Sequence, residues 1–368
     1  MATPLAQLTA LGQSIWYDNI TRTLIRSGEL ARLIKEESLR GMTSNPTIFE
    51  KAVAGSADYD DDIRTLSRAG KSPEEIVDAL MIADVGAAAD VFRPVYDASR
   101  HGDGTVSIEV APTLAHDTEG TIAAARRLWS TLNRPNIMIK IPGTEAGLPA
   151  IAQALSEGIN VNITLLFSLG RYRQVIDAFK DGLERRAAAG HPIDTLHSVA
   201  SFFVSRVDGQ SDAALTKAGA KGAPLLHRIA IANARVAYEL FGASMMTSRW
   251  QALAAKGAKA QRPLWASTST KDPSLPDTFY VDALIAPDTV NTLPPETFNA
   301  FGDHGKPEVR ITPATEKEAA ATLAAYEQLG LTSLDDITRH LEDDGVTKFS
   351  ASWQSLIDRV QEKARTLT

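Results

Sequence analysis

One lysine of this chain stands at the end of an apolar run, two residues before a proline and a glycine. Lys140 lies between the apolar segment 137–139 and the sequence Ile141-Pro142-Gly143. Burying an ammonium group without a partner is costly, and a lysine kept in such a place tends toward the neutral amine. A neutral amine can attack a carbonyl carbon and form a Schiff base, so Lys140 is a candidate nucleophile. A lysine that snorkels out of a strand end, or that pairs with a carboxylate, would also explain this segment.

Polar residues also stand at or near the ends of several other apolar runs. A single polar residue in such a place is most often a turn or cap residue. Their occurrence at successive run ends favours a shared site around Lys140. The segments are Asp18–Asn19, Thr43–Thr47, Glu109, Asn160–Thr164, Ser201–Arg206 and Ser267–Ser269.

Short runs rich in β-branched and apolar residues alternate with helical patterns along the chain. Strands that alternate with helices pair in parallel through right-handed crossovers. Eight such units predict an α/β protein with a closed (β/α)8 TIM barrel, whose active site lies at the C-terminal ends of the strands. No Gly-x-Gly-x-x-Gly follows the first run, which disfavours a dinucleotide-binding fold. The predicted strands are Ser14–Ile20, Gly41–Ser44, Thr105–Val110, Ile137–Ile141, Asn160–Phe167, Val199–Val204, Leu264–Ser267 and Thr278–Ile285.

Helical patterns fill the segments between these strands and extend beyond the last one. The connection of about 60 residues between the sixth and seventh strands has room for two or three helices. No Ser/Gly linker divides the chain, so we expect one barrel domain over residues 1–368, with an N-terminal helix, additional helices after strand six, and a C-terminal helical extension after strand eight. The predicted helices include Leu5–Leu11, Glu74–Phe92, Thr118–Leu132, Ser168–Ala189, Ala230–Leu240, Thr315–Leu329, Leu334–Glu342 and Ser350–Lys363.

Composition limits the class of protein. The 368 residues are 44% hydrophobic and 23% charged, which is typical of a globular protein with a sizeable core. The net charge of −7 argues against binding to nucleic acid by bulk charge. There is no cysteine, and the seven histidines show no close metal-ligand spacing. We therefore expect a cytoplasmic protein with no metal, no nucleic-acid partner and no membrane segment.

Alternation within the strands places polar side chains on common faces. Asn162 and Thr164 share one face of their strand, and Ser201 and Phe203 share one face of the next. Glu109 points to the opposite face from its two apolar neighbours. Polar side chains in otherwise buried strands need partners, and these can partner one another around a barrel lysine.

Three segments of the chain resemble the signature segments of the transaldolase family. They are MTSNPTIF at residues 42–49, IKIPGTEAG at 139–147 and GINVNITLLFS at 158–168. They occur in the family's order, and the resemblance covers residues from about 14 to 290. The whole chain resembles the longer bacterial branch of the class I family, while the extra helices carry less family signal.

The resemblance implies a Schiff-base transferase of the non-oxidative pentose phosphate pathway that uses no cofactor. Lys140 matches the family's Schiff-base lysine, and Asp18 matches the base at the C4 hydroxyl of the ketose phosphate. Glu109 and Thr164 match the pair that holds a catalytic water. The implied reaction moves a dihydroxyacetone unit from sedoheptulose 7-phosphate to glyceraldehyde 3-phosphate, which gives erythrose 4-phosphate and fructose 6-phosphate.

The resemblance also implies contacts to the sugar. Asn45 and Asn162 match asparagines that bind the dihydroxyacetone hydroxyls. Ser201 and Phe203 lie at further substrate-contacting positions. Asn45 could instead be a turn residue, Thr164 could satisfy strand backbone, and Asp18 could cap the following helix.

The phosphate site departs from the family's pattern at one position. Arg206 matches a phosphate-binding arginine, and Ser267 matches a serine on strand seven. The family's better-studied branch has an arginine two residues later, where this chain has Ser269. Lys271 is the candidate for the missing charge, but a lysine lacks the bidentate fork, so the geometry must differ.

Two other functions remain open from the sequence. A fructose 6-phosphate aldolase-like lyase would release free dihydroxyacetone, but that branch is shorter and has a barrel tyrosine near the Schiff base. Phe203 and the pair of Glu109 and Thr164 favour the transferase. A non-catalytic barrel that binds sugar phosphate is disfavoured by the presence of Lys140 and Asp18. We expect sugar phosphates as partners, and a monomer or homodimer.

Overall fold

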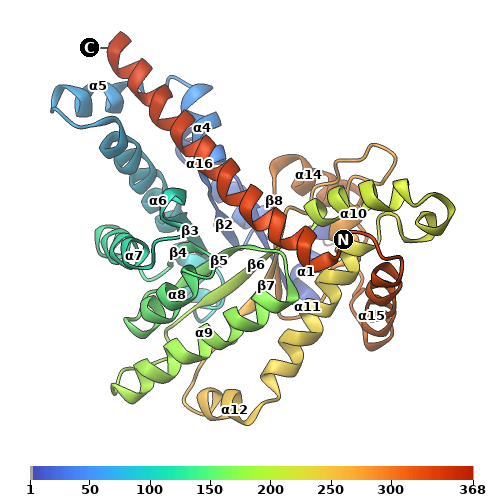
Figure 1. The fold of residues 1–368 in the computed structure, drawn as a ribbon. Coiled ribbons are helices and arrows are strands. Elements are labelled where there is room, and N and C mark those ends of the chain that lie inside the picture. Colours follow the sequence, from blue (N-terminus) through green and yellow to red (C-terminus); the bar gives the residue numbers. More distant parts are fainter. Residues whose placement is uncertain (1–2, 368) are drawn as a thin grey trace.

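A closed barrel of eight parallel strands forms the centre of the computed structural model, which describes residues 3–367 (Figure 1). Each strand pairs with the next one in the sequence, and the last pairs with the first. The predicted α/β class and (β/α)8 barrel are therefore confirmed. The strands are β1 Gln13–Asp18, β2 Gly41–Thr43, β3 Thr105–Glu109, β4 Ile137–Pro142, β5 Val161–Leu166, β6 Ser198–Phe203, β7 Arg262–Ala266 and β8 Thr289–Leu293.

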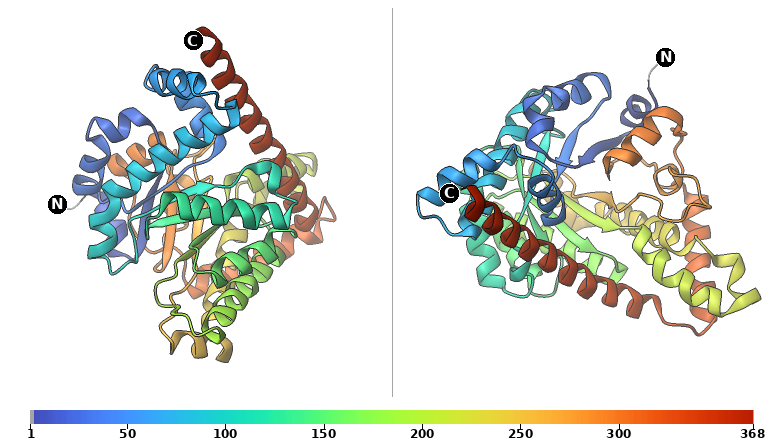
Figure 2. Two further views of the ribbon diagram at one scale, coloured as in Figure 1. Left: turned by 90° about the vertical axis from the view of Figure 1, so that its left-hand side faces the viewer. Right: turned by 90° about the horizontal axis from the view of Figure 1, so that it is seen from above.

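Helices surround this barrel on its outside (Figures 1 and 2). None of the helices within residues 3–367 combines the length and the apolar character that crossing a bilayer requires. The α-helices are α1 Pro4–Ala10, α2 Arg22–Arg26, α3 Glu29–Glu36, α4 Pro46–Ala54, α5 Asp60–Arg68, α6 Pro73–Ala98, α7 Thr118–Leu132, α8 Gly147–Ser156, α9 Leu169–Ala188, α10 Ser205–Lys217, α11 Ile229–Met245, α12 Ser248–Ala254, α13 Phe279–Ala283, α14 Pro295–His304, α15 Pro313–Gln328 and α16 Leu334–Leu367. Short 3-10 turns occur at Pro112–Leu114, Gly219–Lys221 and Ala223–Leu225.

Local sequence explains why these elements start where they do. Every residue of β3, β4, β5 and β6 is buried, as expected for parallel strands covered on both faces. At the start of α6, Ser72 and Glu75 form a capping box, and Pro73 occupies the first helical position. At the start of α4, the side chain of Asn45 accepts a hydrogen bond from the Ile48 amide at 3.1 Å. Buried strands and capped helix starts therefore hold the polar residues at the strand ends in place.

The predicted eighth strand was wrong. Residues 278–285 contain α13, and β8 lies further along at Thr289–Leu293. The buried side chains of the helical segment, Tyr280, Val281, Leu284 and Ile285, recur with a helical rather than an alternating period. The true strand carries the buried polar side chains of Thr289 and Asn291, which weaken its apolar signal.

The two helical patterns predicted near the C-terminal end form one continuous helix. α16 runs from Leu334 to Leu367 without interruption. It crosses the barrel and packs against α4, α5, α6, α10 and β5 (Figures 1 and 2). The extension therefore covers part of the barrel mouth, where the sequence had indicated only additional helices.

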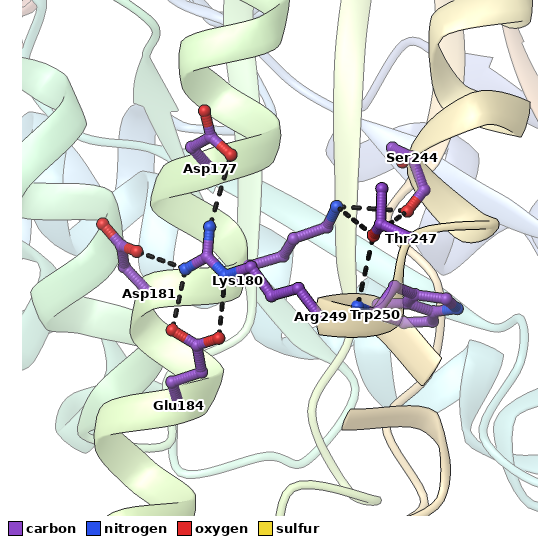
Figure 3. A network of polar contacts seen from close by, with 8 residues as sticks. All are labelled: Asp177, Lys180, Asp181, Glu184, Ser244, Thr247, Arg249 and Trp250. Atoms are coloured by element: carbon purple, nitrogen blue, oxygen red, sulfur yellow. Dashed lines mark hydrogen bonds and ion pairs between the residues drawn. The ribbon is translucent and has the colours of Figure 1, made fainter. Parts of the chain in front are cut away.

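The long connection between β6 and β7 is held against α9 by a polar network (Figure 3). Arg249 of α12 forms ion pairs with Asp177, Asp181 and Glu184 on successive turns of α9. Lys180 of the same helix is buried, points away from these acidic side chains, and donates a hydrogen bond to the Ser244 carbonyl at 3.1 Å. Exposed ion pairs contribute little singly, but the partnered buried lysine fixes where α11 and α12 meet α9.

Candidate active site

A cavity of about 510 Å³ opens at the C-terminal ends of the strands. This is the end at which TIM-barrel enzymes carry their active sites. Ten of the twelve predicted site residues line it: Asp18, Asn45, Lys140, Thr164, Ser201, Phe203, Arg206, Ser267, Ser269 and Lys271. The other two, Glu109 and Asn162, are buried and make contacts with lining residues, described below.

Lys140 is buried in this cavity, with 4% of its surface exposed. Its Nζ lies 3.0 Å from Oε2 of Glu109 and donates a hydrogen bond to the Ser44 carbonyl at 3.2 Å. Strand register explains the first contact, because Glu109 of β3 lies directly beside Lys140 of β4. Lys140 therefore does not snorkel out of the strand end to solvent. It pairs with a carboxylate, which was the other structural explanation considered from the sequence.

A chain of hydroxyl groups holds Asp18 at the end of β1. Oδ1 of Asp18 accepts a hydrogen bond from Oγ1 of Thr43 at 2.6 Å. That hydroxyl lies 2.7 Å from Oγ1 of Thr292 on β8. Asp18 does not cap α2, because Thr21 does so. The carboxylate therefore faces the cavity with a fixed orientation.

The carboxyl groups of Asp18 and Glu109 both have pKa values raised above the ordinary range. Withdrawal from solvent raises the pKa of Asp18, and the nearby Lys140 and Thr43 partly oppose this rise. Burial likewise raises the pKa of Glu109, against the opposing effect of Lys140. Perturbed carboxyl groups in a cleft are typical of acid–base sites. One lysine thus lies among two carboxyl groups whose affinity for protons is increased.

Two buried oxygens near Lys140 lack partners. Oε1 of Glu109 and Oγ1 of Thr164 have no hydrogen-bond partner among residues 3–367. The strands that carry them flank β4 on either side. Buried polar atoms of this kind are normally satisfied, so they mark a place for a water molecule or a substrate hydroxyl.

Amide and hydroxyl side chains line the cavity or bind to residues that line it. Asn162 is fully buried; its Oδ1 accepts from the Ser201 hydroxyl at 2.7 Å, and its Nδ2 donates to Ser107 at 3.0 Å. Asn45 lines the cavity, although its carbonyl oxygen already caps α4. The turn role considered for Asn45 is therefore real, and it leaves the amide nitrogen available.

Arg206 lies in the first turn of α10, directly after β6. Its guanidinium group packs over the ring of Phe203, 5.1 Å from the ring centroid. Burial lowers the pKa of Arg206, and its buried Nη1 has no hydrogen-bond partner among the described residues. A cation at the N-terminus of a helix is unfavourable alone, and a bound anion would offset that cost.

The turn after β7 carries the remaining residues that were predicted to bind phosphate. Ser267 adopts a left-handed conformation, with φ of 56°, and its hydroxyl lies 3.1 Å from that of Ser205. Ser269 and Lys271 follow it along the cavity wall, and Lys271 is exposed. A positively charged side chain thus stands on the same side as Arg206, as expected if it replaces an arginine.

The sequence missed several residues of the cavity. Thr43 and Thr292 orient Asp18, the Ser44 carbonyl holds Lys140, and Phe349 of α16 lies over the lysine amine. Thr43 and Ser44 were visible at a predicted strand end. Thr292 was lost with the misplaced eighth strand, and Phe349 depends on packing between distant segments. Within residues 3–367, no group of three or more histidine or acidic side chains is arranged to hold a metal ion.

The fold and the cavity together define a (β/α)8-barrel enzyme with a buried lysine and two carboxyl groups at its catalytic end. Comparison with known proteins gives the particular family. The model of the transaldolase/fructose-6-phosphate aldolase family matches residues 15–360. The chain therefore belongs to the transaldolase/fructose-6-phosphate aldolase family.

Relatives named transaldolase cover nearly the whole chain. The transaldolase of Acidothermus cellulolyticus is 54% identical over 368 residues, which is 99% of each chain. That of Parafrankia sp. is 52% identical over 365 residues, covering 99% of this chain and 98% of the relative. That of Thermobifida fusca is 51% identical over 364 residues, or 99% of each. The similarity includes the helices beyond the barrel.

Proposed function

We propose that this transaldolase moves a dihydroxyacetone unit from sedoheptulose 7-phosphate to glyceraldehyde 3-phosphate through a Schiff base on Lys140. The products are erythrose 4-phosphate and fructose 6-phosphate, as in the non-oxidative pentose phosphate pathway. One observation carries the proposal: a buried lysine amine, 3.0 Å from a carboxylate, faces a cavity that also holds the carboxylate of Asp18.

The first step is attack of the Lys140 amine on the C2 carbonyl of the donor. Glu109 is placed to take a proton from Nζ, because its Oε2 lies 3.0 Å away. The partner-free atoms of Glu109 and Thr164 would hold a water that relays this proton, and a second proton that Nζ loses after attack, to the departing C2 oxygen. Loss of that oxygen as water leaves a positively charged iminium.

The second step breaks the C3–C4 bond. Asp18 takes the proton of the C4 hydroxyl, the bond electrons move toward the iminium, and erythrose 4-phosphate leaves as an aldehyde. The retained three-carbon unit stays on Lys140 as an enamine. The raised pKa of Asp18 makes it a stronger base than an ordinary aspartate. The enamine then attacks the aldehyde of the acceptor, and the same steps run in reverse.

Recognition of the sugar falls to two groups of side chains. We propose that Asn45, Asn162 and Ser201 contact the dihydroxyacetone hydroxyls, while Phe203 packs beside them. Arg206, Ser267, Ser269 and Lys271 bind the phosphate at the opposite end. The partner-free Nη1 of Arg206 supports this assignment. No cofactor is required, because the iminium itself accepts the bond electrons.

We propose that the enzyme works in the cytoplasm and acts on sugar phosphates. We also propose that it is a monomer or a homodimer. The net charge of −7 supports a small-molecule substrate rather than a nucleic acid. The catalytic cavity is formed within one chain.

Sodium borohydride added during incubation with fructose 6-phosphate should fix a dihydroxyacetone adduct on Lys140, as detected by peptide mass spectrometry. Consumption of fructose 6-phosphate should also depend on added erythrose 4-phosphate. An adduct on another residue would contradict the assignment of Lys140. Rapid release of free dihydroxyacetone without an acceptor would identify a lyase instead.

Replacing Lys271 with alanine should raise the KM for fructose 6-phosphate by about tenfold, because one charged contact to the phosphate is lost. Lys271→Arg should preserve or strengthen binding. The measurement compares fructose 6-phosphate with unphosphorylated fructose, whose kinetics should not change. Lys256→Ala, at an exposed lysine outside the cavity, is the control for net charge. Equal losses for both sugars would show that Lys271 does not bind phosphate.

A further inference from the structure

Helix α16 is fastened across the mouth of the barrel by contacts with α4 (Figures 1 and 2). The hydroxyl of Thr47 donates to Ser352 at 2.8 Å, and Ser355 donates to Glu50 at 2.8 Å. Further along, Lys363 forms an ion pair with Asp60 at 2.7 Å. The first two contacts hold α16 beside α4, which follows β2 and lines the catalytic cavity, and the third ties α16 to α5.

A close approach between α16 and β5 sets how deeply the helix sits. A Cβ atom on Gly345 would lie 2.9 Å from Cδ2 of Leu165, which is closer than packed carbon atoms come. Leu165 itself has a left-handed backbone, with φ of 60°, where the register of β5 shifts. A buried leucine in this conformation is strained, and such strain concentrates at functional sites. Both features bring α16 against the strand that carries Thr164.

One turn beyond Gly345, α16 places an aromatic ring in the cavity. Phe349 is 5% exposed, lines the cavity, and has its ring centroid 5.7 Å from Nζ of Lys140. The amine therefore meets two polar groups, Glu109 and the Ser44 carbonyl, and one apolar surface. The ring thus makes the cavity wall beside the nitrogen apolar.

We propose that Phe349 is an active-site residue that keeps solvent, other than the water held by Glu109 and Thr164, from the covalent intermediate, and so favours transfer to an acceptor over release of dihydroxyacetone. This inference rests on the proposed Schiff base at Lys140. Gly345 and Leu165 act as positioning residues, because they set the depth at which α16 presents the ring.

The chemistry of release explains why a dry surface matters at this place. The enamine must gain one proton on the carbon that was bonded to C4, which gives an iminium. One water molecule then adds to C2, the C2–N bond breaks, and the lysine amine and free dihydroxyacetone are regenerated. Transfer instead needs the acceptor aldehyde at the same carbon. Both routes later add the water held by Glu109 and Thr164 to C2. Only release needs a proton from solvent on the enamine carbon, and the apolar ring of Phe349 keeps additional water from the intermediate.

The test measures two rates with fructose 6-phosphate as the donor. One is the rate of dihydroxyacetone release without an acceptor, and the other is the rate of transfer to erythrose 4-phosphate. The result is the ratio of release to transfer. Phe349→Ala should raise this ratio by about tenfold, equivalent to about 1.4 kcal/mol between the two barriers. Phe349→Leu should restore a ratio close to that of the native enzyme, because it keeps an apolar cover. A graded series of Leu, Val and Ala keeps the test decisive if the smallest side chain destabilises the fold.

Leu356→Ala is the matched control on the same helix. Leu356 is 1% exposed and does not line the cavity, so its loss loosens α16 without uncovering the amine directly. An unchanged ratio in Phe349→Ala, or an equal rise in Leu356→Ala, would overturn the role of Phe349. Borohydride trapping on the native enzyme is read separately: if no adduct forms on Lys140, the proposed reaction itself fails.

Discussion

Replacing Lys140 with methionine should abolish the borohydride adduct and lower the rate of transfer by about 10⁴-fold or more. Methionine has a similar length but no amine, so no covalent intermediate can form. Removing a nucleophile from a site of cooperating groups has effects of this size. The measurement is the rate of transfer in a coupled assay, together with mass spectrometry of the trapped enzyme. Substantial residual transfer would show that the nucleophile lies elsewhere.

The matched control addresses the fold. Lys140→Met alone leaves the buried carboxylate of Glu109 without its cation, and breaking a buried pair in this way costs about 3–5 kcal/mol of stability. The double variant Lys140→Met with Glu109→Gln removes both charges. It should therefore unfold at a higher denaturant concentration than the single variant, while being equally inactive. Recovery of activity along with stability would mean that Lys140 has only a structural role.

Replacing Asp18 with asparagine should leave the Schiff base intact but slow cleavage of the C3–C4 bond by about 10²- to 10⁴-fold. The asparagine keeps an oxygen that can accept the hydrogen bond from Thr43, so the local structure is preserved. Trapping of the intact ketose adduct, compared with release of erythrose 4-phosphate in a single turnover, separates the two steps. An equal loss of trapping would place Asp18 in imine formation instead.

Thr292→Val provides the comparison for Asp18. It removes a hydroxyl from the same hydrogen-bonded chain but keeps the carboxylate, so most of the cleavage rate should remain. In the native enzyme the base must be ionised, so cleavage should speed up as pH rises through the pKa of Asp18. Burial raises that pKa above its ordinary value of 3.8, so the loss of cleavage rate on acidification should begin at a higher pH than for an ordinary aspartate. This loss of rate should be absent from the pH–rate profile of Asp18→Asn.

Much of the site could be predicted because parallel strands bring their carboxyl ends to one edge. Glu109 and Lys140 are far apart along the chain but direct neighbours in the register of β3 and β4. Asn162 of β5 is the neighbour of Lys140 on the other side. Side-chain alternation and strand order therefore suffice to gather them, and the family resemblance adds their roles.

The rest of the site depends on information that a local pattern does not contain. The eighth strand was misplaced because its buried polar residues interrupt an apolar run, whereas α13 offers a strongly apolar one. Two helical patterns were predicted where α16 is continuous. Phe349 is an ordinary apolar residue of an amphipathic helix until tertiary packing places it over Lys140.

The position of α16 in the chain has a consequence for synthesis of the enzyme. All eight strands precede it, and chains fold from the N-terminus as they leave the ribosome. The barrel can therefore close, with Lys140 already paired to Glu109, while the ring of Phe349 is still being made. A nascent barrel would present its lysine to the metabolites of the cell without this cover. The proposed role of Phe349 therefore predicts that selective, acceptor-dependent chemistry is among the last properties that the growing chain acquires.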